Sequence, residues 1–174
     1  MEKPINPSGL PTTTLGADKV NLFVTSHLNR IYCAKSHLVE RLPEMALQAR
    51  FSELKHAINE TLNDVEKQII RMAEIYVLLD INYSFENCNG LIGMIEEAYD
   101  AIHNQPDDYE IRDLAILFYL QNIESIELSS FQALQLLAVG LKNKHISQLL
   151  LENFDSAKED RALLLVITKR YLGT

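Results

Sequence analysis

The chain has 174 residues and a mass of 19.8 kDa, enough for one domain that buries roughly 70% of its unfolded surface. Its 16 Lys and Arg against 24 Asp and Glu give a net charge of −8, and no basic block is present, which argues against binding to nucleic acid or to an anionic membrane. The sequence shows neither a signal-peptide pattern nor a run of transmembrane length, so we expect a cytoplasmic protein.

The N-terminal region differs in composition from the rest of the chain. Residues 1–16 hold three of the five prolines and show no periodicity, which predicts a flexible arm before a helical domain over residues 17–174. A first helix is predicted from about Ala17 to Glu40, with Lys35 inside its apolar stripe. Proline removes a backbone donor and crowds the preceding turn, so the sequence predicts either a kink or a new turn over Pro43–Arg50.

Four more helices are predicted in the remainder. Ser52 is a good N-cap for a helix over Ser52–Leu79, whose apolar residues recur at about 3.5-residue spacing. Asp80–Gly90 is rich in turn-forming residues, and a shorter helix from Leu91 ends before Asn104. Long helices then follow over Ile111–Leu141 and from Ile146 to about Leu172. These elements predict an all-α protein, a four-helix bundle with an additional short crossover helix.

Two glutamates lie inside the apolar face of the helix predicted over Ile111–Leu141. Glu124 and Glu127 continue a series with spacings of three and four residues, which places side chains on one helix face. The other members of the series are Leu117, Leu120, Phe131 and Leu134. An ionised carboxylate is too costly to bury alone, so this pair is expected to meet a metal, a cation or a proton unless its face is open to water.

The other residue types that carry chemistry form no recognisable pattern. Cys33 and Cys88 are far apart and belong to no Cys-x-x-Cys motif, which favours two buried thiols over a zinc site or a disulfide. The five histidines form no Glu-x-x-His motif, and His56 falls beside the apolar stripe of its helix. No phosphate-binding loop or nucleophile elbow is present, so no catalytic residue is predicted.

Four segments carry a further signal, and they are Tyr32–Leu38, Asn59–Thr61, Gly93–Ala98 and Ile123–Leu128. In their order and spacing they resemble the bacterial YciE/YciF family, a ferritin-like group of unknown function associated with stress responses. The resemblance covers roughly residues 20–172 and implies a ferritin-like four-helix bundle that dimerises, with a metal centre in some members.

The chain departs from the family at positions where a metal centre needs ligands. Lys35 stands where the first helix of the family has a carboxylate, and Ala157 stands where its last helix has one. Glu60 is kept, but the histidine and the glutamine or histidine that flank it in the family are absent. Glu124 and Glu127 are both present. The resemblance therefore implies a di-metal centre that has lost ligands from two helices.

From these residues we predict a non-catalytic ferritin-like protein with a degenerate di-metal centre and no expected cofactor. Lys35 is predicted to form a core ion pair with Glu124 or Glu127, because a lysine in an apolar stripe needs such a partner. In an alternative interpretation, Lys35 extends its ammonium to solvent and the two glutamates face a polar edge.

A different functional class is also compatible with the sequence. A ferritin-like oxidoreductase or metal-storage protein would bind iron or manganese through Glu60, Glu124 and Glu127, with help from Asp64 or Asp160. A homodimer is expected in either case, because the helix that contains the two glutamates is apolar on more than one face. A third class is a docking module that binds a protein partner through its acidic surface or residues 1–16.

Overall fold

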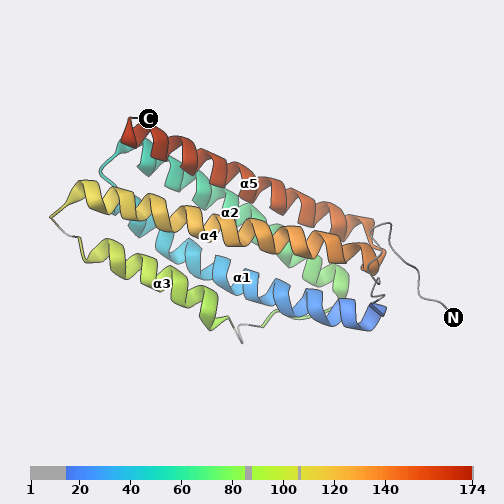
Figure 1. Ribbon diagram of the computed structural model, residues 1–174. Helices are drawn as coiled ribbons and strands as arrows, with labels where there is room; N and C mark the ends of the chain where they lie inside the picture. The colour runs from blue at the N-terminus through green and yellow to red at the C-terminus, as the bar shows by residue number, and fades with distance from the viewer. Residues whose placement is uncertain (1–14, 85–87, 106, 174) are drawn as a thin grey trace, which may run out of the picture.

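The computed structural model describes residues 15–84, 88–105 and 107–173, and shows the predicted helical bundle (Figure 1). Within these ranges no residue forms a strand, and no helix has the length and hydropathy that a membrane span requires. The predicted arm lies outside the described residues except for its last two positions. The elements are α1 (Ala17–Gln48), α2 (Ser52–Leu79), α3 (Asn89–His103), α4 (Tyr109–Ala138), the 3₁₀ turn η1 (Val139–Leu141) and α5 (Lys144–Leu172).

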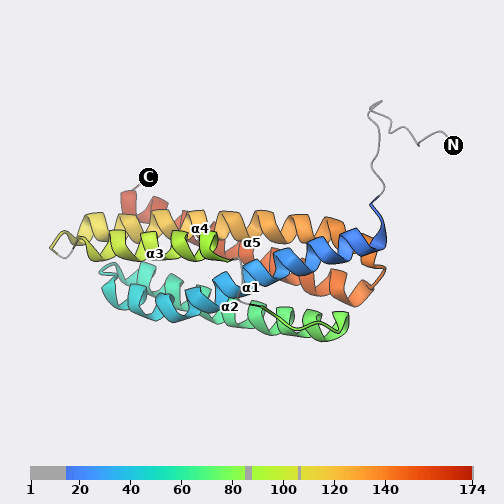
Figure 2. The same ribbon diagram turned by 90° about the horizontal axis from the view of Figure 1, so that it is seen from below.

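The four long helices pack around one core, and the short helix lies outside it. In the bundle α1 packs on α2 and α4, and α5 packs on α2 and α4. The chain crosses from α2 to α4 through α3, which packs on α1 and α4. Figures 1 and 2 show α3 beside the N-terminal half of α4 only. No helix of the described ranges covers the other half of the surface between α1 and α4.

The apolar core has two halves, and a polar layer separates them. One half is built on the later part of α1 and the early part of α4, with residues such as Leu38 and Ile116. The other half is built on the early part of α1 and the later part of α4, with residues such as Leu28 and Phe131. Buried polar side chains occupy the level between them, which makes this level the candidate site. They are Lys35, Gln68, Glu124, Glu127, Asn153 and Asp160.

Helix α1 continues through Pro43 to Gln48, so the prediction that a new turn begins at this proline is wrong. Pro43 removes one backbone hydrogen bond from the helix. The residues around it, Leu42, Met45 and Ala46, are all buried in the core. Burial of these side chains offsets the lost hydrogen bond, because each fully buried aliphatic side chain contributes roughly 1.5–3 kcal/mol.

The start of α2 is capped from another helix. The predicted cap, Ser52, is the first helical residue and its side chain accepts no capping hydrogen bond. Asp113 of α4 is buried instead, and its carboxylate accepts the backbone N–H groups of Arg50 and Phe51 at 2.9 and 2.8 Å. This carboxylate therefore binds the two backbone N–H groups just before α2, whereas a capping Ser52 would accept from an N–H within the first turn.

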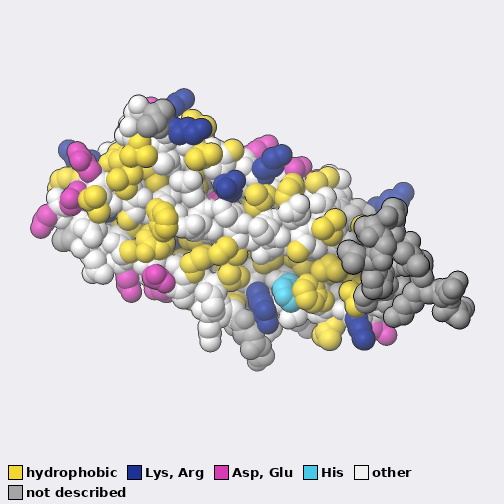
Figure 3. All heavy atoms as spheres, viewed as in Figure 1, with side chains coloured by type: hydrophobic (Ala, Val, Ile, Leu, Met, Phe, Trp, Pro, Cys, Tyr) yellow, Lys and Arg dark blue, Asp and Glu magenta, His cyan; other side chains and the backbone are white. Residues whose placement is uncertain are grey.

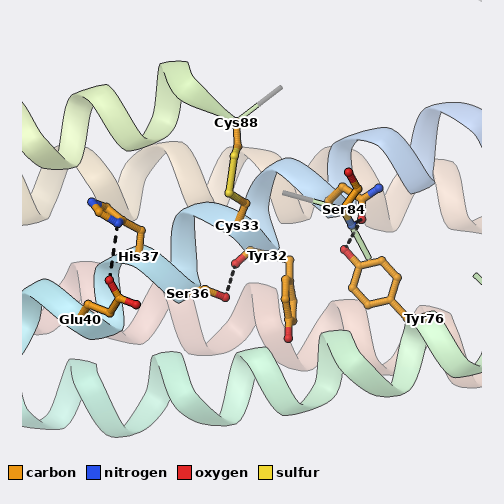
Figure 4. The surroundings of a disulfide bond; sticks show 9 residues. Tyr32, Cys33, Ser36, His37, Glu40, Tyr76, Ser84 and Cys88 are labelled. Atoms are coloured by element: carbon orange, nitrogen blue, oxygen red, sulfur yellow. Dashed lines mark hydrogen bonds and ion pairs between the residues drawn. A yellow bond between two sulfur atoms is a disulfide. The ribbon is translucent and has the colours of Figure 1, made fainter. Parts of the chain in front are cut away.

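Helix α3 is held against α1 at two points. A disulfide joins Cys33 of α1 to Cys88, the residue before α3, with their Cα atoms 6.3 Å apart (Figure 4). Farther along, Glu96 accepts hydrogen bonds from Arg41 Nε and Nη2 at 2.7 and 2.9 Å. The guanidinium, with help from His37, lowers the pKa of Glu96. The expectation of two thiols is corrected here, because the crossover returns Cys88 to α1 although 55 residues separate the two cysteines.

Candidate functional site

A buried ion pair lies at the centre of the polar layer. Lys35 is on the inner face of α1, and its side chain is fully buried. Its ammonium donates to Oε2 of Glu127, which α4 presents from the opposite side of the core. The same nitrogen lies 5.5 Å from the centre of the Phe131 ring, a distance suited to a cation–π contact. The lysine therefore extends into the bundle and has a carboxylate and an aromatic ring as its neighbours.

Glu124 lies one turn before Glu127 and is in a different electrostatic state. The side chain is fully buried, and neither carboxyl oxygen has a hydrogen-bond partner. Burial raises the pKa of Glu124 well above its usual value, and the negative charge of Glu127 raises it further, against a smaller opposing effect of Lys35. Burial therefore favours the protonated, neutral form of Glu124, and Glu127 is the α4 member of the ion pair in the core.

Helices α2 and α5 complete the polar layer. Asp160 on α5 is only 2% exposed, and burial followed by repulsion from Asp64 raises its pKa to about 7. One oxygen of Asp160, Oδ2, has no hydrogen-bond partner. Gln68 on α2 donates from Nε2 to the hydroxyl of Ser156 at 2.9 Å, while its Oε1 is unpartnered. These helices therefore contribute buried acceptors to the layer and no buried cation.

The layer reaches the surface between α2 and α5. A cavity of about 360 Å³ opens there, and Asp64, Lys67 and Asp160 are among its lining residues. Glu60 lies on the outer part of this cavity and is half-exposed, with its carboxylate 3.4 Å from Nε2 of His56. The fold thus brings together Lys35, Glu124 and Glu127, but places Glu60 on the surface of the bundle.

The donor set does not fit a di-metal centre. Such a centre needs several carboxylates and imidazoles from all four helices to offset the charge of two cations. Here α1 presents the ammonium of Lys35, and Ala157 is the fully buried α5 residue one turn before Asp160. In the described residues, no three His, Cys, Asp or Glu side chains are grouped so as to hold a metal ion. No chemical step through a metal follows from this arrangement.

Two buried polar residues of the layer, Gln68 and Asn153, were not singled out from the sequence. Asn153 is fully buried on α5, and its Nδ2 donates to the backbone oxygen of Gln68 at 3.4 Å. A signal for Gln68 was present, since it lies three residues after Val65 and four before Met72, both fully buried. This spacing marks the inner face of a helix.

Comparisons with known proteins agree on one family and one fold. Residues 21–170 match the family described as "Domain of unknown function (DUF892)". The chain is 28% identical over 133 residues to Protein YciF of Escherichia coli strain K12, covering 75% of this chain and 79% of YciF.

Two solved structures are similar to this fold. YcfI from Rhodopseudomonas palustris, described as a candidate structural protein, is 26% identical with a TM-score of 0.77, and the match covers 86% of this chain and 93% of YcfI. The E. coli stress protein YciF is 22% identical with a TM-score of 0.82, and the match covers 92% of this chain and 99% of that one. These similarities confirm the predicted YciE/YciF-like family and the predicted ferritin-like bundle.

Proposed function

Because this chain belongs to the YciF-like family of domains described as DUF892, we propose that it is a non-catalytic member whose di-metal centre has degenerated. The observation that carries the proposal is the buried pair of Lys35 and Glu127. The ammonium lies on the inner face of α1, where the family resemblance expects a metal-binding carboxylate. A fixed positive charge of the protein then takes the role that a bound cation would have.

The charge balance of the layer supports this interpretation. Lys35 supplies one positive charge and Glu127 one negative charge, and they are in direct contact. Burial and the charge of Glu127 both favour the protonated, neutral form of Glu124. The layer is therefore close to electroneutral without any added ion, apart from partial ionisation of Asp160 near pH 7. Two divalent cations added beside an ammonium would instead meet strong repulsion in a medium of low dielectric constant.

The wider role that we propose is structural and stress-associated, by similarity to the two relatives. YcfI is described as a candidate structural protein and YciF as a stress protein. We further propose a homodimer, because α4 leaves large apolar side chains exposed on its outer face. These side chains are Phe118 and Leu136. Covering them with a second subunit would remove apolar area from water.

Metal analysis of the full chain tests the proposal. The protein would be produced in medium supplemented with iron and manganese, purified without chelators, and analysed for metal content. We expect much less than one equivalent of either metal, and no change in thermal stability when Fe²⁺ or Mn²⁺ is added. Near-stoichiometric iron or manganese that is lost in Glu124→Gln and Glu127→Gln variants would overturn the proposal. That result would favour the oxidoreductase or storage protein instead.

A further inference from the structure

An apolar cavity lies outside the polar layer, on the surface between α1 and α4. Its volume is about 590 Å³, within the range that holds small organic ligands. Leu91, in the first turn of α3, lines one end of the cavity. This end is where α3 begins, and beyond it α3 no longer covers α1 and α4. Figure 3 shows, on this face, a histidine and a basic side chain beside several hydrophobic side chains. Its apolar lining residues include Phe23, Ile31, Ile126 and Leu134.

The serine hydroxyls of the cavity wall donate hydrogen bonds within α4. The hydroxyls of Ser125, Ser129 and Ser130 donate to the backbone oxygens four residues earlier, at 2.6, 2.9 and 2.7 Å. Each hydroxyl proton is therefore already used. The α4 side of the cavity offers a ligand apolar surface and hydroxyl lone pairs, but no hydroxyl donor.

The α1 side of the cavity supplies its polar end. His27 stacks on Phe23 with ring centroids 3.8 Å apart, and its Nδ1 donates to the backbone oxygen of Phe23 at 2.9 Å. A carbonyl oxygen only accepts, so Nδ1 carries the proton of this hydrogen bond. Among the described residues that line the cavity, Arg30 is the only arginine or lysine.

Arg30 differs from the other arginines of the chain. Each of the others donates a side-chain hydrogen bond, pairs with a carboxylate or lies over an aromatic ring. Within the part of the chain that the structure describes, Arg30 has no such contact. The protein carries a net charge of −8, so carboxylates are abundant on its surface. A guanidinium that meets none of them and borders an apolar cavity is suited to an anionic group on a ligand.

We propose that this cavity binds a free aliphatic carboxylate of medium chain length. The carboxylate would pair with Arg30 at the rim, and the hydrocarbon chain would lie against Ile31, Ile126 and Leu134. Three observations together support this assignment: the charge of Arg30, the absence of a hydroxyl donor on the α4 side, and the aliphatic side chains that line the cavity. A neutral hydrocarbon would leave the guanidinium unused, and a polyanion would find no second cation on the wall. The proposal is independent of the metal-free core, since none of these residues belongs to the polar layer.

Calorimetry with sodium dodecanoate, kept below its micelle concentration, tests the proposal. We expect one site with a dissociation constant on the order of 10–100 µM, as is reasonable for a ligand of this size. Dodecanol, the neutral analogue, should bind about ten-fold more weakly. Arg30→Gln should weaken dodecanoate about ten-fold and leave dodecanol unchanged. Lys55→Gln removes the same charge from the exposed face of α2 and serves as the matched control.

A second variant separates the cavity from non-specific adsorption. Ala133 is an exposed cavity residue on α4, so Ala133→Trp should fill the cavity without disturbing the core and should abolish binding. Circular dichroism would verify that the variant folds. A photoreactive fatty acid should label residues 23–31 and 125–134 in the wild type. Unchanged affinity in Ala133→Trp, labelling elsewhere, or binding to anionic vesicles without binding to free dodecanoate would overturn the proposal.

Discussion

Replacing Lys35 by methionine removes the only cation of the polar layer and preserves most of the side-chain volume. Lys35 is fully buried and in contact with Glu127, while burial favours the neutral form of Glu124. In the variant, Glu127 would be a buried carboxylate with no counter-charge. Because such a group avoids ionisation, the folded variant should take up a proton there. We therefore expect Lys35→Met to destabilise the protein in a pH-dependent manner.

The size of the loss follows from the cost of that protonation. An ordinary glutamic acid has a pKa of about 4.3, roughly 2.7 units below pH 7, and each unit is worth about 1.4 kcal/mol. The expected loss at pH 7 is therefore about 3–4 kcal/mol, within the range of about 3–5 kcal/mol typical of a broken buried ion pair. The unfolded variant also binds the proton at lower pH. At pH 5 the difference from wild type should consequently shrink to about 1 kcal/mol.

Urea unfolding of wild type and variant at pH 7 and pH 5 measures both values. Arg170→Met is the matched control, because its exposed pair with Glu53 should contribute less than about 1 kcal/mol. The triple variant Lys35→Met, Glu124→Gln, Glu127→Gln should recover much of the loss, since no charge remains to be neutralised. A loss below about 1 kcal/mol at pH 7, or an equal loss at both pH values, would refute the reasoning.

Four further predictions concern the polar layer, the disulfide and assembly. The pKa of Asp160 is about 7 in the folded chain and near 4 unfolded, so stability falls as pH rises between these values. Asp160→Asn should remove that fall, so that the variant gains at most about 4 kcal/mol in free energy of unfolding, relative to the wild type, between pH 4 and pH 7. Parallel curves of the free energy of unfolding against pH for the two proteins would contradict this. Lys35→Glu combined with Ala157→Glu should create affinity for Fe²⁺ or Mn²⁺ that calorimetry does not detect in the wild type. If neither protein binds these metals, the two missing carboxylates are not what prevents metal binding. Replacing Cys33 and Cys88 by alanine opens a 55-residue loop and should cost about 2–4 kcal/mol in denaturant unfolding under oxidising conditions, with no difference once a reductant is added. Light scattering at high micromolar concentration should give the mass of a dimer, and monomer alone would count against the proposed assembly.

The helices could be predicted because their apolar residues recur with helical spacing over many turns. The prediction was weakest where one position decided the register. On α2 the apolar residue at the level of the polar layer is Ile69, but Gln68 is fully buried and Ile69 is only partly buried. Hydrophobicity alone selects the isoleucine. The spacing from Val65 to Met72 admits both positions, so only tertiary packing decides between them.

The polar layer could be predicted only in part. Glu124 and Glu127 were predicted because they interrupt an apolar series, and this signal depends only on positions within one helix. Whether Lys35 bonds to Glu124 or to Glu127 depends on the relative heights of α1 and α4, which no pattern within one helix contains. Cys33 and Cys88 illustrate the same limit. Their proximity is created by the crossover through α3, which is a property of the path of the chain.

The disulfide also determines how the molecule would extend under mechanical force. The closed loop between Cys33 and Cys88 contains all of α2, so a pull on the two termini cannot straighten that helix while the bond is intact. At about 3.4 Å per extended residue, the disulfide prevents the 55-residue separation from adding roughly 190 Å to the extended length of the chain. A single-molecule extension trace should lengthen by that amount when a reductant is added. The oxidised chain therefore keeps α2 and the later half of α1 inside a covalent ring.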